Sequence, residues 1–205
     1  MAASSTIDWS HVESEALELF RALLRFDTTN PPGNEKPCAE FLADELRKDG
    51  LEPVVLESTP GRSNVITRIK GNGSKPPLLL NAHLDVVYAD PAAWKHPPFG
   101  GEVHDGVLWG RGALDMKNMA AMSATVMRLF KRTGLVPDRD LIFAAVADEE
   151  NGCTWGSEWL VANHPDLVRA EYALGEVGGF TLQVGKLVYL PVMVAHKGVV
   201  WGRLK

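Results

Sequence analysis

The chain has 205 residues, of which 45% are hydrophobic and 23% charged, and its formal net charge is −5. This balance is typical of a soluble globular domain, and the negative charge without a basic stripe argues against a nucleic-acid-binding surface. No apolar run approaches the roughly 18 residues of a membrane helix, and residues 1–13 lack the basic and apolar regions of a secretory signal, so we expect a cytoplasmic protein without a membrane partner.

Apolar residues recur at helical spacing in some segments and form continuous or alternating runs in others. In chain order the expected elements are helices over 8–26 and 36–49, strands within 53–57, 63–71 and 76–87, a hairpin within 103–112, a helix over 117–131, a strand over 140–147, a helix over 157–163 that ends before Pro165, a strand over 172–175 and a hairpin within 180–205. This alternation predicts an α/β fold with a largely parallel or mixed central sheet sandwiched by helices.

Side chains that can bind metal ions follow three of the expected strands and precede one helix. They are His83 and Asp85 after strand 78–82, Asp115 before helix 117–131, Asp148, Glu149 and Glu150 after strand 140–147, and Glu176 after strand 172–175. Because the carboxyl ends of parallel strands meet at one edge of a sheet, we expect these side chains to gather there.

Histidine, aspartate and glutamate are ligands of zinc and similar divalent ions, and this many carboxylates suits two ions about 3.5–4 Å apart. Asp85 follows His83 by two residues and can accept the ring N–H that faces away from a metal. One carboxylate should stay free of metal as a general base. Each feature also has a simpler interpretation: a structural histidine, a helix cap at Asp115, or a solvated acidic loop at 148–150. The metal site is favoured over these interpretations, because several such features fall at the strand ends of one predicted sheet.

Four segments resemble, in this order, the motifs of the aminoacylase/carboxypeptidase family of di-zinc amidohydrolases. They are HLDVV (83–87), PPFGGEVHDGVLWGRGALDMKNM (97–119), ADEENG (147–152) and GEVGG (175–179). This family includes acetylornithine deacetylase, succinyl-diaminopimelate desuccinylase, glutamate carboxypeptidase and related dipeptidases. The resemblance covers almost the whole chain and implies a zinc-peptidase-like catalytic domain.

The resemblance also implies a role for each residue. The implied metal ligands are His83, Asp115, Glu150 and Glu176, with Asp115 bridging two divalent ions that are zinc, or else cobalt or manganese. The implied catalytic residues are Asp85, which supports His83, and Glu149, which takes a proton from a metal-bridging water and passes it to the leaving amine. A cis peptide bond after Asp115 is implied as well.

Residues 196–205 alternate in hydrophobicity and stop without a turn residue. We therefore expect 1–195 to be the N-terminal part of a metal-dependent catalytic domain, and 196–205 to be the first strand leading into a missing lid or dimerisation domain. The family completes its second zinc site with a late histidine, which His196 does not replace.

The expected function is zinc-dependent hydrolysis of an amide bond in a small peptide or N-acyl amino acid, by a full-length form that is a homodimer. The alternative is a metal-binding but catalytically incompetent fragment or binding module. Cys38 and Cys153 fit no metal spacing and are expected to be reduced thiols. The remaining histidines match no motif and are expected to be structural: His11, His96, His104 and His164.

Overall fold

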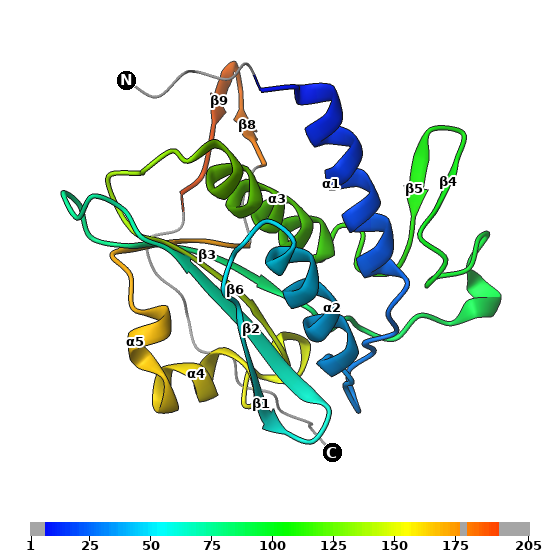
Figure 1. The fold of residues 1–205 in the computed structure, drawn as a ribbon. Helices are drawn as coiled ribbons and strands as arrows, with labels where there is room; N and C mark the ends of the chain where they lie inside the picture. Colours follow the sequence, from blue (N-terminus) through cyan, green and yellow to red (C-terminus); the bar gives the residue numbers. More distant parts are fainter. Residues whose placement is uncertain (1–6, 177–179, 193–205) are drawn as a thin grey trace. The chain divides into compact units, whose positions relative to one another are not determined.

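The computed structural model describes residues 7–176 and 180–192, and the chain divides into two compact units, Met1–Leu174 and Gly175–Lys205 (Figure 1). The elements of the first unit are α1 (Trp9–Leu24), α2 (Lys36–Arg47), β1 (Val54–Thr59), β2 (Arg62–Ile69), β3 (Leu78–His83), η1 (Pro91–Ala93), β4 (Glu102–His104), β5 (Val107–Trp109), α3 (Lys117–Thr133), β6 (Leu141–Val146), η2 (Glu149–Asn151), α4 (Ser157–Asn163), α5 (Pro165–Val168) and β7 (Tyr172–Leu174). The expected elements of this unit are thus confirmed, with bounds that differ by a few residues.

The second unit contains one described hairpin, β8 (Leu182–Val184) and β9 (Leu187–Tyr189). This agrees with the hairpin expected within 180–205, and its turn is Gly185-Lys186, where Gly185 has a positive φ of 61°. The strand expected over 196–205 lies outside the described residues.

The central sheet is mixed, and its strand order is β1-β2-β6-β3-β7. β3 runs parallel to both β6 and β7, and α3 crosses over between β3 and β6. β2 is antiparallel to β6 and to β1, because the short turn at residues 60–61 returns the chain directly beside β1. The predicted site residues His83 and Asp148 lie at or just after the ends of β3 and β6, which belong to the parallel half of the sheet.

Helices cover both faces of this sheet, as the sequence predicts (Figure 1). Every residue of β6 is buried, and successive side chains point to opposite faces. Phe143 packs in the cluster that includes α1, α2 and α3, whereas its neighbour Ile142 packs with Leu160 of α4. The continuous apolar run of β6 thus reflects burial from both sides.

Local sequence signals explain where the helices begin and end. Asp8 caps α1, since its side chain accepts a hydrogen bond from the backbone N–H of His11 at 3.2 Å. Gly134 ends α3 in the left-handed conformation, with φ of 65°. α4 ends before Pro165, as the sequence predicts. Pro165 is also the first residue of the one-turn helix α5, where a backbone N–H is not needed for a helical hydrogen bond.

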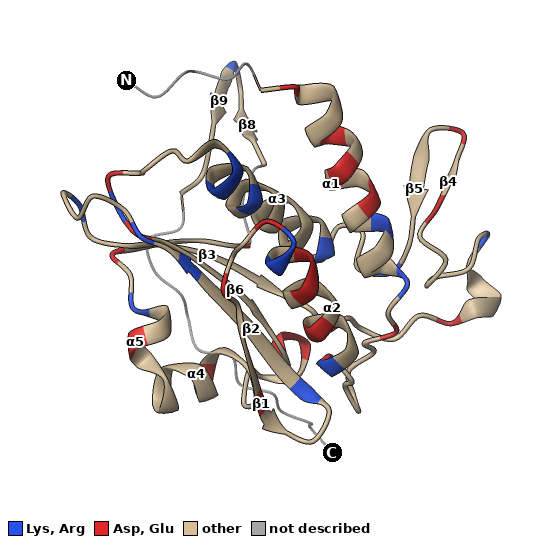
Figure 2. Cartoon of the chain, in the orientation of Figure 1, with Lys and Arg blue, Asp and Glu red and all other residues tan. Residues whose placement is uncertain are grey.

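Charged side chains of both signs lie on the helices (Figure 2), and several of them join one helix to another. Arg132 of α3 pairs with Glu15 of α1 and with Asp49, which follows α2. These ion pairs connect the three helices on one face of the sheet. Among the described residues, no helix combines the length and apolar composition needed to cross a bilayer.

Candidate metal centre

The parallel strands β3 and β6 bring two of the predicted motifs to one edge of the sheet. His83 is the last residue of β3 and lies opposite Val146, the last residue of β6. Two residues after Val146 the acidic turn begins with Asp148, and η2 follows from Glu149. The expectation that these motifs meet at the carboxyl ends of the strands is confirmed for this part of the site.

His83 is the fixed centre of this edge. Its side chain is 1% exposed, and its Nε2 lies 2.9 Å from Oδ1 of Asp115 and 3.8 Å from Oε2 of Glu149. The Asp115 and Glu149 side chains are 62% and 42% exposed, so they approach a buried imidazole from the solvent side. The structure therefore places two carboxylates close to Nε2 of one buried imidazole.

Asp115 does not act as a helix cap. The residue at the N-cap of α3 is Met116, and no side chain makes a capping hydrogen bond there. The peptide bond between Asp115 and Met116 is cis, as the family resemblance implies. The Asp115 carboxylate faces the His83 ring instead.

The second ring nitrogen of His83 is held by Asp85. Nδ1 lies 2.9 Å from the backbone carbonyl oxygen of Asp85 and 3.5 Å from its carboxylate Oδ1. The sequence predicts the carboxylate as partner, whereas the closer of these two oxygens belongs to the backbone. With Nδ1 donating to this oxygen, Nε2 is the nitrogen that can bind a metal ion.

The Asp85 carboxylate joins β3 to the acidic turn. It is fully buried, and it accepts hydrogen bonds from the backbone N–H groups of Glu149 and Glu150, both at 3.0 Å. The side-chain amide of Asn30 donates a third bond at 2.8 Å. Burial raises the pKa of Asp85, but these bonds and His83 outweigh burial and lower it overall. Asp85 is thus an ionised anchor that fixes the backbone of two predicted site residues.

The three acids of the turn have different environments. Asp148 is buried, and its Oδ1 accepts hydrogen bonds from Arg62 Nη2 and Asn30 Nδ2, both at 3.0 Å. Its Oδ2 accepts a bond from the backbone N–H of Trp155 at 3.1 Å. Arg62 also binds the buried Glu35 with two bonds of 2.6 and 2.8 Å. Asp148 therefore holds the turn in place, and the solvated-loop interpretation of residues 148–150 is wrong for this acid.

Negative charge accumulates on the open side of the turn. Burial is the main cause that raises the pKa of Glu150, and the charge of Asp115 raises it further. Carboxylates that crowd together in this way favour a proton or a cation between them. A histidine nitrogen beside several carboxylates is also a donor set that suits zinc and similar divalent ions. These residues fit the metal ions that the family resemblance implies.

A family model supports the same conclusion from the sequence side. The model of peptidase family M20/M25/M40 matches residues 79–194, which is more than half of the chain. The chain belongs to peptidase family M20/M25/M40. The matched range includes every predicted site residue from His83 to Glu176.

Relatives in the M20/M25/M40 family include enzymes named for deacylation. The chain is 36% identical over 152 residues to a succinyl-diaminopimelate desuccinylase of Methylobacterium radiotolerans, covering 72% of this chain and 38% of the relative. It is 35% identical over 170 residues to aminoacylase-1 of Sus scrofa, covering 80% of this chain and 41% of the relative. The chain thus spans about two fifths of the length of these relatives.

Solved structures of M20 peptidases share the fold. An M20 family metallo-carboxypeptidase from Sulfolobus solfataricus superposes with a TM-score of 0.69 at 23% identity, covering 80% of this chain and 38% of that one. Human carnosine dipeptidase 1 gives a TM-score of 0.66 at 20% identity, covering 82% and 40%. These likenesses confirm the predicted zinc-peptidase-like α/β architecture.

The sequence analysis did not identify three buried residues that hold Asp85 and Asp148 directly or through each other: Asn30, Glu35 and Arg62. One signal was available in Gly33, because a Cβ atom there would lie 2.2 Å from Cζ of Arg62. A glycine in that loop thus leaves room for a buried guanidinium. Glu176 belongs to the second unit, so its role as a ligand stays a prediction.

Proposed function

We propose that this chain forms the catalytic part of a divalent-metal-dependent hydrolase that cleaves the amide bond of a small peptide or N-acyl amino acid. The observation that supports this most directly is the buried His83 ring, whose Nε2 faces the carboxylates of Asp115 and Glu149. Family membership and the names of the relatives, a desuccinylase and an aminoacylase, suggest the reaction class.

In this proposal His83, Asp115 and Glu150 hold the metal ions, together with Glu176. The ions are zinc, with cobalt or manganese as alternatives, because imidazole and carboxylate suit all three. When bound, such ions polarise a carbonyl group and lower the pKa of a coordinated water. Burial and then the charge of Asp115 raise the pKa of Glu150, and this crowding of carboxylates supports a binding site for cations.

Glu149 is the proposed general base. Its backbone is fixed by the bond to Asp85, while its partly exposed carboxylate extends toward His83 and solvent. In the reaction Glu149 accepts a proton from the attacking water and donates it to the leaving nitrogen. Asp85 does not touch the substrate in this scheme, and its role is to position His83 and the acidic turn.

The proposal also includes a cytoplasmic location and, for the whole protein, a homodimer. The dimer is inferred only from the family resemblance. Analytical ultracentrifugation of the full-length protein tests it, and a monomer across the concentration range would reject it.

The test of function combines metal content with hydrolysis. Elemental analysis of the purified protein should find a divalent ion, and His83→Ala with Asp115→Ala should remove it. Glu149→Gln should keep the metal and lose hydrolysis of a panel of N-acyl amino acids and dipeptides. Full activity of Glu149→Gln would reject its role as base. A wild-type protein that binds metal but cleaves nothing in the panel would favour the binding-module alternative.

A further inference from the structure

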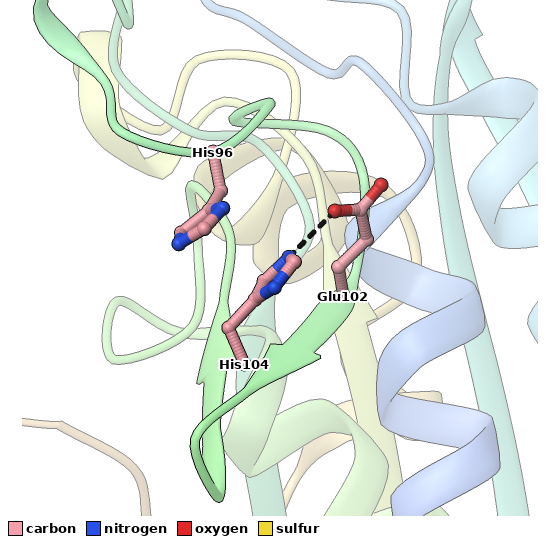
Figure 3. Close-up of side chains that lie close together, drawn as sticks. All are labelled: His96, Glu102 and His104. Atoms are coloured by element: carbon pink, nitrogen blue, oxygen red, sulfur yellow. Dashed lines mark hydrogen bonds and ion pairs between the residues drawn. The ribbon is translucent and has the colours of Figure 1, made fainter.

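Three side chains of types that can bind metal ions lie together at the β4–β5 hairpin and the loop before it, and none of them belongs to the site described above. Glu102 and His104 are two residues apart on β4, so their side chains lie on the same face of the hairpin. Trp109 of β5 pairs with Glu102 and shares that face. His96, which comes from the loop before the hairpin, packs against it (Figure 3).

The contacts among these side chains are close. The His96 and His104 rings are stacked, with centroids 3.6 Å apart and planes 9° from parallel, and Nε2 of His104 lies 2.7 Å from Oε2 of Glu102 (Figure 3). The edge of His96 also contacts the Trp109 ring, at a centroid distance of 4.8 Å. One ligand atom from each of His96, Glu102 and His104 lies within 4.8 Å of the other two.

His96 is not satisfied by hydrogen bonds in this arrangement. Its Nε2 is buried and has no hydrogen-bond partner in the described part of the chain. Burial lowers the pKa of His96, and the nearby His104 and Lys95 lower it further, which favours the neutral form of the ring. A neutral imidazole has a lone pair available for a metal ion.

We propose that His96, Glu102 and His104 form a second metal site, which takes one borderline divalent ion such as Zn²⁺, Ni²⁺ or Cu²⁺. Two imidazoles and a carboxylate match the ligand preference of these ions, and three protein ligands leave a fourth position for water. The site shares no residue with the candidate metal centre, so it does not depend on the proposed hydrolysis.

Binding requires a small rearrangement. Parallel rings cannot both direct a lone pair at one ion, so the two imidazoles must tilt apart. The ligand atoms of a tetrahedral zinc site lie roughly 3.3 Å from one another, so the side chains must also close in on the ion. His104 and Glu102 can make this movement, because their side chains are 38% and 47% exposed.

The proposed ion connects two separate pieces of chain. β4 and β5 have three residues each and form a sheet of their own, and a two-stranded hairpin has little stability alone. An ion held by His96 from the preceding loop and by two residues of β4 stabilises the hairpin against that loop. The expected consequence is a more stable hairpin in the metal-bound protein.

The test compares metal stoichiometry among variants of the protein after chelator treatment and Zn²⁺ titration. Wild type should bind one ion more than His96→Gln/His104→Gln. His83→Ala/Asp115→Ala, which removes the candidate metal centre, should keep this ion. Glu102→Gln should weaken its affinity by at least ~10-fold. Equal stoichiometry in wild type and His96→Gln/His104→Gln would overturn the proposal.

His164→Gln is the matched control. His164 also lies against a tryptophan, Trp159, at 4.9 Å, but it belongs to no three-residue ligand cluster among the described residues. This variant should bind as many ions as wild type, and a loss equal to that of the double variant would overturn the proposal.

Tryptophan fluorescence gives an independent readout if the double variant folds poorly. Cu²⁺ bound beside His96 should quench Trp109, so Trp109→Phe should reduce the quenched fraction. Unchanged quenching in Trp109→Phe would count against the site.

Discussion

The buried Arg62 behind the acidic turn allows a quantitative test of how the site is supported. Arg62 is 6% exposed, and its guanidinium donates two hydrogen bonds to Glu35, one to Asp148 and one to the carbonyl oxygen of Pro32. Arg62→Met keeps much of the apolar stem but removes every donor and the charge. The buried carboxylates of Glu35 and Asp148 then lose the guanidinium that both of them bind.

The expected loss follows from that arrangement. Removing one partner of a buried ion pair costs about 3–5 kcal/mol, because the remaining charge is left desolvated. Burial already raises the pKa of Glu35 even with Arg62 present, so Glu35 can take up a proton in the variant. Protonation limits the cost, and we expect a loss of about 3 kcal/mol at pH 7.

The sign of the pH dependence follows from the same residue. A carboxyl whose pKa is higher in the folded protein than in the unfolded chain destabilises the fold increasingly as pH rises above the unfolded value of about 4.3. The loss of unfolding free energy in Arg62→Met should therefore be larger at pH 8 than at pH 5. In Arg62→Met/Glu35→Gln this difference should shrink.

Urea unfolding monitored by circular dichroism measures these free energies. The control is Arg47→Met, since Arg47 pairs with Asp44 on the surface and the two side chains are 50% and 71% exposed. We expect that control to lose less than about 1 kcal/mol. A loss below 1 kcal/mol in Arg62→Met, or a loss independent of pH, would refute the reasoning.

Three further outcomes are expected. Burial raises the pKa of Asp140, but hydrogen bonds led by that of Lys70 lower it to about 2. Its stabilisation is therefore present above pH 4 and is lost as the pH falls through 2. Asp140→Asn should cost about 1–2 kcal/mol at pH 7 and less than about 0.5 kcal/mol at pH 2 in urea unfolding. Gly156→Ala would place a Cβ atom 1.8 Å from the carbonyl oxygen of Ala147, which should cost about 1–3 kcal/mol, and an unchanged melting temperature would contradict this. Asp85→Asn should weaken metal binding by about 10–100-fold in chelator competition while the protein stays folded, and wild-type affinity would reject its positioning role.

Much of the fold could be predicted, because its signals are local. Periodicity and turn residues identified the strands and long helices of the first unit, and the uninterrupted apolar run before Asp148 indicated a buried strand. They did not identify η2, the short helix that carries Glu149 and Glu150. The direction of β2 could not be predicted from its own residues, since burial on both faces is the same in either direction. The decisive fact was the short turn at residues 60–61, which is too short for a crossover.

The positions of the candidate ligands that follow strand ends were predictable, whereas the supporting contacts from residues distant in the sequence were not. Arg62 and Asp148 are 86 residues apart in the chain, and no spacing rule connects them. His96 and His104 were expected to be structural, because the family resemblance implies no role for either, although His104 lies within the segment 97–119. Their stacking with each other and the contact of His104 with Glu102 appear only when the hairpin is folded.

The contact between Asn30 and two buried carboxylates also has a consequence for spontaneous deamidation of the protein. Asn30 donates to Asp85 and to Asp148 through the same amide nitrogen. Deamidation would turn this donor into a third buried acid and break both contacts. That reaction begins when the backbone nitrogen of the next residue attacks the side chain and loses its proton. The next residue is Pro31, whose nitrogen has no proton to lose, so Asn30 is chemically protected against this form of damage.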